Sequence, residues 1–164
     1  MKRVLILLIA AITVILGNEL TQAKKTFPGM LTGGFSASTL IERQGGYTNI
    51  SSRCQRNLKK AGFTLSNQRT VTLHDVDDEY NDVLVKATEK TYSKGRIKVY
   101  LNYIPGTNTP CSLEIDFPNQ TSRNSFLKSL RVLGFIGSGD SYVATSTGLC
   151  VSCEGNHVEI AYTL

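Results

Sequence analysis

Residues 57–63 and 129–135 repeat one helix-ending motif, and this repeat constrains the fold more than any other feature of the chain. Both segments read polar-Leu-basic-x-apolar-Gly-Phe. A glycine just past a helix adopts the left-handed backbone conformation that ends helices, and the apolar residue after it commonly packs back onto the helix. The sequence therefore predicts two short helices, which end at Gly62 and Gly134.

The segments around the two helices also follow a common order. A β-rich run precedes each helix and two such runs follow it, at 35–42, 64–74 and 82–88 in the first half and at 111–117, 141–147 and 157–163 in the second. A further run, 96–104, joins the halves. We expect two β-α-β-β units, 35–93 and 94–164, whose helices pack on an antiparallel sheet in a single α+β domain, 35–164. Because such helix endings are common, coincidence is the alternative to a duplication.

The first residues resemble a targeting segment rather than part of the fold. Two cations precede the run 4–16, in which every residue except Thr13 is apolar. A cationic start, an apolar stretch of about 7–15 residues and small residues before a cut are typical of a secretory signal peptide. A membrane-spanning helix needs about 20 apolar residues, more than this run supplies. We expect a signal peptide over 1–23, a loose leader over 24–34, and a secreted or periplasmic protein without a stable membrane span.

The charge balance indicates the class of partner. The chain has a formal net charge of +5, and it stays positive when the expected signal peptide is removed. Nucleic acid is an improbable partner for an exported protein, and no aromatic and basic residues interleave as in a stacking platform. Another protein or an anionic envelope component fits better, although a mild positive charge also serves solubility alone.

Basic residues concentrate on the outer positions of the two predicted helices. This pattern makes them candidates for contact with a partner, although a charged helix exterior is usually just the solvated side. The candidate partner-binding residues are Arg53, Arg56, Lys60, Arg123, Lys128 and Arg131.

Four cysteines in an exported chain of this size predict two disulfides. Three connectivities are possible. Cys54 and Cys111 both occupy positions expected to face the core, which favours Cys54–Cys111 together with Cys150–Cys153. The second pair requires a turn between its members, because three extended residues span about 10 Å and a disulfide needs Cα atoms within about 7 Å. A zinc site made of Cys150, Cys153 and His157 is the alternative.

An acidic segment at 74–82 is the densest polar cluster. Its carboxylates Asp75, Asp77, Asp78 and Glu79 are candidate ligands for a hard cation such as Ca²⁺. The segment lacks the spacing of a calcium-binding EF-hand loop, and carboxylates often occupy exposed hairpin turns because water solvates them there. We therefore favour a solvated turn, and we expect neither a metal nor a cofactor.

Two stretches permit an enzymatic alternative. Gly139-Asp140 and the segment 156–162 resemble the Gly-Asp and His-Val-Gly-Ile-Tyr stretches of the NlpC/P60 cell-wall cysteine peptidases. The resemblance implies a cysteine hydrolase in which Cys54 or Cys111 acts with His157. However, Cys111 lacks the preceding aspartate of that family's motif. The CxxC spacing of Cys150 and Cys153 also permits a disulfide oxidoreductase.

Taken together, these features favour an exported binding module without catalytic activity. An inhibitor, an immunity-type protein or an envelope accessory protein would fit export, a compact α+β fold and segregated charge. An envelope thiol enzyme that uses the cysteines above is the alternative. A reactive Cys54 of low pKa, or an easily reduced Cys150–Cys153 pair, would favour the enzyme, whereas a protein without free thiols would disfavour it.

Overall fold

The computed structural model describes residues 35–76 and 82–162. The helices of this part are α2 (Cys54–Lys60), α3 (Gln120–Leu130) and the 3₁₀ turns η1 (Ala37–Thr39) and η2 (Arg131–Leu133). Its strands are β1 (Ile41–Gln44), β2 (Tyr47–Ile50), β3 (Thr64–Val76), β4 (Asp82–Lys94), β5 (Ile97–Tyr103), β6 (Ser112–Asp116), β7 (Ile136–Ser138), β8 (Ser141–Ala144), β9 (Leu149–Glu154) and β10 (His157–Tyr162). The expected signal peptide and leader lie outside the described residues.

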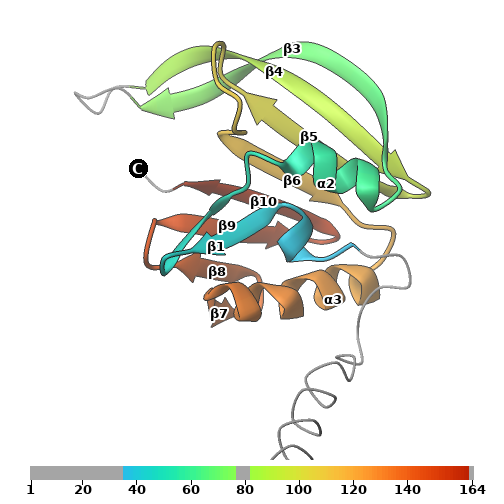
Figure 1. Ribbon diagram of the computed structural model, residues 1–164, viewed down its shortest axis with the longest axis vertical. Coiled ribbons are helices and arrows are strands. Elements are labelled where there is room, and N and C mark those ends of the chain that lie inside the picture. Colours follow the sequence, from blue (N-terminus) through green and yellow to red (C-terminus); the bar gives the residue numbers. More distant parts are fainter. Residues whose placement is uncertain (1–34, 77–81, 163–164) are drawn as a thin grey trace, which may run out of the picture. The chain divides into compact units, whose positions relative to one another are not determined.

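One large antiparallel sheet organises the fold. Its strand order is β3-β4-β5-β6-β10-β9-β8-β7, and β1 and β2 form a separate two-stranded sheet. Figure 1 shows both helices and the β1–β2 hairpin on the same face of the large sheet. Helices gathered on one face of an antiparallel sheet make this an α+β fold, as predicted. We call the opposite side of the large sheet its outer face.

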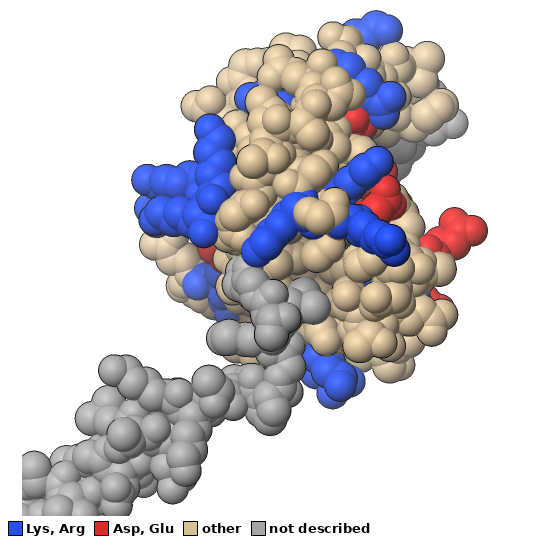
Figure 2. Space-filling model, turned by 90° about the vertical axis from the view of Figure 1, so that its right-hand side faces the viewer, with Lys and Arg blue, Asp and Glu red and all other residues tan. Residues whose placement is uncertain are grey.

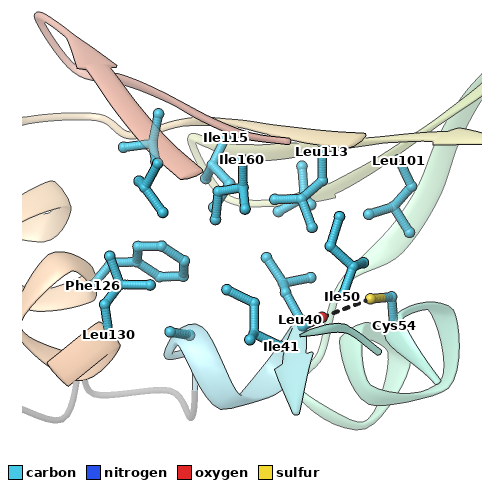
Figure 3. Packing of buried hydrophobic residues seen from close by; sticks show 14 of the residues in the cluster. Leu40, Ile41, Ile50, Cys54, Leu101, Leu113, Ile115, Phe126, Leu130 and Ile160 are labelled. Atoms are coloured by element: carbon cyan, nitrogen blue, oxygen red, sulfur yellow. Dashed lines mark hydrogen bonds between the residues drawn. The ribbon is translucent and has the colours of Figure 1, made fainter. Parts of the chain in front are cut away.

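The core lies between the sheet and this layer of helices. Strand β6 shows the expected alternation, because Leu113 and Ile115 are buried while Ser112, Glu114 and Asp116 are partly exposed on the outer face. Figure 3 shows side chains of the large sheet pointing toward those of the layer that covers it. The labelled residues are Leu101, Leu113, Ile115 and Ile160 of the sheet and Leu40, Ile41, Ile50, Cys54, Phe126 and Leu130 of the covering layer. Burial of this apolar surface is the main favourable term in folding.

Four phenylalanines form an aromatic cluster in this core. The Phe126 ring stacks on Phe35 with centroids 5.5 Å apart and lies 5.4 Å from Phe117. Phe63 approaches Phe35 at 4.8 Å. The cluster therefore ties α3 to the sheet and to the residues that precede η1.

The two predicted helix endings are confirmed in detail. Gly62 and Gly134 have φ values of 85° and 86°. The next residue in each case donates its backbone N–H to a carbonyl five residues earlier, Phe63 to Leu58 at 2.9 Å and Phe135 to Leu130 at 3.4 Å. This is the hydrogen bond of a Schellman motif. Both phenylalanines are buried, so each returns the chain to the core as the motif predicts.

The start of the first half differs from the prediction. Residues 35–42 were expected to form one strand, but they form η1 and the beginning of β1. The chain then turns at Gly45 and Gly46, both with positive φ, so that β2 pairs back on β1. A two-residue Gly-Gly loop favours this tight hairpin. As a result, the strand before α2 lies in the small sheet while β6, before α3, lies in the large one.

The remaining predicted strands are present with shifted ends. The runs at 64–74, 82–88, 96–104, 111–117, 141–147 and 157–163 correspond to β3, β4, β5, β6, β8 and β10. Strand β4 continues to Lys94, six residues beyond the predicted end. Strands β2, β7 and β9 were not predicted. Within the described ranges, no helix is long and apolar enough to cross a membrane.

Candidate functional site

Helix α2 presents the densest group of exposed cations in the described chain. Arg53 at its N-cap and Arg56, Lys59 and Lys60 within it are all exposed. The buried face of the helix carries Cys54 and Leu58, so the cations lie on the side that faces solvent. No acidic side chain among residues 35–76 and 82–162 forms an ion pair with any of the four. We call these four residues the α2 basic face.

Helix α3 contributes fewer accessible charges than the sequence predicted. Lys128 and Arg131 are exposed. Arg123, in contrast, has a side chain only 13% exposed. Its guanidinium donates to the Gly155 carbonyl and lies 3.4 Å from an Asp140 carboxylate oxygen. Arg123 therefore fixes the β7–β8 and β9–β10 turns to α3, and little of its side chain is accessible to a partner.

Acidic side chains concentrate on the outer face of the sheet. The antiparallel register places Glu114 of β6 directly opposite Glu159 of β10, and Asp116 opposite His157. Glu154 of β9 also pairs with His157. Figure 2 shows blue Lys and Arg side chains over much of this view of the molecule and red Asp and Glu side chains mostly toward the right. The outer face therefore carries several acids together with the cations Arg69 and Lys98, whereas the charged residues of α2 are all cations.

Glu114 and Asp116 on the outer face have neighbours that compensate them. His157 Nδ1 lies 2.8 Å from Asp116 Oδ1, and its Nε2 lies 3.7 Å from Glu114. The Tyr100 hydroxyl donates to the other Asp116 oxygen at 2.7 Å. Burial and this hydrogen bond to a carboxylate raise the pKa of Tyr100 to about 12. The hydroxyl therefore remains a donor at neutral pH.

The Glu89 carboxylate is compensated on the same face. Arg69 donates to it through two nitrogens, at 2.8 and 3.1 Å, in a bidentate pair between β3 and β4. Glu89 is buried, whereas the Arg69 side chain is 60% exposed. Two parallel hydrogen bonds fix the geometry of such a pair. The α2 basic face has no comparable arrangement among the described residues.

Asp116 gives the outer face a pH dependence. Burial acts to raise the pKa of Asp116, but hydrogen bonds from His157 and Tyr100 outweigh it and leave the pKa below its ordinary value of 3.8. A carboxyl whose pKa is lower in the folded state stabilises the fold above the pKa of the unfolded chain, and this stability is lost as pH falls through the folded pKa.

Asp116→Asn is therefore expected to lower stability at neutral pH by less than about 1 kcal/mol, because the pair is half exposed. As pH falls below about 4, the variant should also lose less stability than the unmodified protein. Urea unfolding at pH 7 and pH 3 measures both effects. An equal loss of stability at the two pH values would show that the carboxylate charge is not the cause.

The metal candidates fall mostly outside the described residues. Asp77, Asp78 and Glu79 lie there, and Asp75 is at the end of β3. Within the described part of the chain, no three His, Cys, Asp or Glu side chains are arranged to hold a metal ion. This result includes the zinc alternative of Cys150, Cys153 and His157.

All four cysteines are free thiols in this structure, so the two predicted disulfides are not formed. Cys54 is buried under α2, and its Sγ donates to the Leu40 carbonyl at 3.0 Å (Figure 3). The Cys111 thiol donates instead to the Asn102 carbonyl at 3.3 Å. Each of these two thiols therefore has a backbone acceptor of its own.

The prediction of a turn between Cys150 and Cys153 is wrong. Both cysteines lie in β9, which continues from Leu149 to Glu154 and pairs with β10 along its length. Three residues of extended strand separate their Cα atoms by about 10 Å, too far for a disulfide. The sequence signal for β9 was the alternation of Leu149, Val151 and Cys153 with more exposed residues, which the CxxC spacing obscured.

Thiol titration is expected to count four thiols per chain when the protein is unfolded without reductant. In the folded protein, Cys54 should react last, since burial raises the pKa of its thiol to about 12 and no solvent reaches it. Alkylation followed by peptide mass spectrometry identifies the order of reaction. A count of zero or two in the unfolded chain would show that disulfides form after all.

Cys54 and Cys111, the two candidate nucleophiles, lie away from His157. Cys54 is on the core side of the sheet, whereas His157 is on the outer face. Cys111 precedes β6 by one residue, and His157 pairs with Asp116 at the other end of that strand, about 17 Å away at 3.4 Å per residue. A cysteine nucleophile needs its histidine within hydrogen-bond reach. The geometry of the described residues does not provide this for either cysteine.

Sequence reasoning missed the group formed by Tyr100, Glu114, Asp116 and His157. The alternation in β6 placed Glu114 and Asp116 on one face, but nothing local indicated that β10 would be the neighbouring strand.

Comparison of the chain with protein-family models, with characterised proteins and with solved structures finds no match.

Proposed function

We propose that this protein is a non-catalytic binding module whose α2 basic face contacts an acidic surface of another protein. The observation that carries the proposal is the group of four exposed cations, Arg53, Arg56, Lys59 and Lys60, without an acidic partner among the described residues. A concentrated field of one sign attracts and orients a partner of the opposite sign.

Local electrostatics supports a functional origin of this charge. Lys59 and Lys60 lie in the last turn of α2, where the helix dipole favours cations. Arg53 and Arg56 lie at its start, where the dipole disfavours them, and the first turn contains no acidic residue. Arg56 also precedes Lys60 by four residues, a like-charge pair that destabilises a helix. An acidic partner would relieve both unfavourable terms.

The outer face is the weaker candidate surface. Three of its acids, Glu89, Glu114 and Asp116, already interact with Arg69, His157 and Tyr100 inside the molecule, whereas Glu154 and Glu159 do not. A partner would have to compete with these contacts, whereas no ion pair within the described part of the chain occupies the α2 basic face.

The predicted signal peptide leads us to propose that the protein acts outside the cytoplasm. We retain a secreted or periplasmic location, with an inhibitor, an immunity-type protein or an envelope accessory protein as the class. The duplication of 35–93 and 94–164 also remains part of the proposal, and the matching hydrogen bonds after Gly62 and Gly134 support it.

Titration with polymers of known charge tests the proposal. The purified protein is titrated with a polyglutamate peptide, with a polylysine peptide of equal length, and with phosphatidylglycerol vesicles. We expect binding to polyglutamate that weakens steeply between about 50 and 200 mM salt, since the Debye length falls over that range. Equal or tighter binding of polylysine, or no binding of polyglutamate at low salt, would refute the proposed role of the α2 basic face. Binding to the vesicles alone would indicate an anionic envelope component instead.

A further inference from the structure

We propose that β3 pairs with β3 of a second copy of this chain, which joins the two large sheets edge to edge. The inference concerns a different surface from the α2 basic face, and it does not depend on the proposed function.

Strand β3 is an unusually long open edge. Among the strands that the structure describes, it is the outermost of the large sheet, contains 13 residues and pairs only with β4. Figure 1 shows no other labelled element beyond it. The opposite edge, β7, has only three residues. An edge strand presents a row of backbone N–H and C=O groups that can pair with another chain, and a long one is an effective template.

The C-terminal part of β3 lacks the features that usually block such pairing. It contains no lysine and no proline, and the register irregularity that twists the strand lies at its other end, between Leu65 and Asn67. Arg69 is the one cation of β3, and Glu89 already pairs with it. From Thr70 to His74 every side chain of β3 is either uncharged or a histidine. The Lys86 ammonium of β4 donates to Thr72 Oγ1 at 2.9 Å, so one cation of each copy also lies near the proposed contact.

One antiparallel register suits a second copy best. With Thr72 opposite Thr72 on a two-fold axis, Val71 of each copy stands opposite Leu73 of the other. Within one chain, Val71 pairs with Ala87 and Leu73 with Val85, so these four share one face of the β3–β4 ribbon. Val71 and Leu73 are only half-buried. Dimerisation would make this a continuous apolar stripe, in which each cross-strand pair contributes about 0.2–1 kcal/mol.

The same register explains why a second copy is favoured over an unrelated strand. A two-fold axis at Thr72 keeps the Arg69 side chains of the two copies apart and matches apolar residues with apolar residues. A two-fold interface is self-complementary by construction. The axis would also place both α2 basic faces on the same side of the joined sheet, so that an acidic partner could bind both of them.

Sedimentation velocity on the purified protein and on two matched variants tests the inference. Val71→Lys introduces a cation at the proposed interface, whereas Leu84→Lys introduces one at an exposed position of the same ribbon on the neighbouring strand. We expect a dimer for the unmodified protein and for Leu84→Lys, and a dissociation constant at least about tenfold higher for Val71→Lys. Circular dichroism confirms that each variant is folded, and Thr70→Lys, at an exposed position, replaces Val71→Lys if that variant unfolds.

Three results would overturn the inference. These are a monomer at all concentrations up to hundreds of micromolar, an unchanged dimer in both edge variants, or an equal loss of dimer in Leu84→Lys. A monomer whose β3 amides become protected from hydrogen exchange only when an extended peptide is added would mean that β3 binds another chain. The double variant Arg56→Glu with Lys60→Glu should leave the dimer intact, because these residues lie outside β3. Loss of dimerisation can therefore be distinguished from loss of binding through the α2 basic face.

Discussion

Phe126→Ala is expected to lower the free energy of unfolding by about 3–5 kcal/mol, the cost of deleting a buried aromatic side chain and leaving a cavity. Phe126 is completely buried and contacts the rings of Phe35 and Phe117. The deletion removes the contact between α3 and the rest of the aromatic cluster. Urea unfolding followed by circular dichroism measures the loss, and the midpoint should fall with little change in slope.

Val132→Ala is the control for this prediction. Val132 lies in η2, which follows α3, and is 66% exposed. Its truncation therefore perturbs the same region of the chain without removing a buried side chain. Its effect should remain within about 0.5 kcal/mol. If Phe126→Ala cost less than about 1 kcal/mol, α3 would not be packed on the sheet as described.

Arg56→Glu with Lys60→Glu is expected to weaken binding of the polyglutamate peptide about a hundredfold, or ~2.7 kcal/mol. Each reversal removes one attractive charge and adds a repulsive one, and like charges across an interface are costly. Both residues are exposed and form no ion pair among the described residues, so the fold should not change. Calorimetric titration at low salt measures the change.

A variant with the same change in net charge separates location from total charge. Lys86→Glu with Lys98→Glu reverses two exposed cations of the large sheet, outside the helix layer. We expect less than about a threefold effect, from long-range charge alone. An equal loss in both double variants would mean that net charge, and not the α2 basic face, causes binding.

The parts of the fold set by local interactions could be predicted from the sequence. Gly62 and Gly134 end helices through backbone geometry that needs only a few neighbouring residues. The alternation in β6 likewise gave the correct buried face, and the basic positions of α2 followed from its helical period. These predictions depend on the chemistry of adjacent residues, which any short segment contains.

Features set by contacts between distant residues could not be predicted. The pairing of β6 with β10 brings Asp116 to His157, and nothing near either residue indicates it. Arg123 has the sequence position of an exposed helix cation, but the Gly155 carbonyl, 32 residues away, accepts its hydrogen bond. Cysteine spacing favoured a turn at Cys150 and Cys153, but pairing with β10 holds this segment extended.

The single variant Arg56→Glu tests the account most directly, because it should change stability and binding in opposite directions. It places an acid in the first turn of α2 and creates a favourable pair with Lys60, so the free energy of unfolding should rise by about 0.5 kcal/mol. Affinity for polyglutamate should nevertheless fall about tenfold. Unfolding and binding measured on the same sample give both values. Unchanged affinity in a variant that is equally or more stable would contradict a functional role for the α2 basic face.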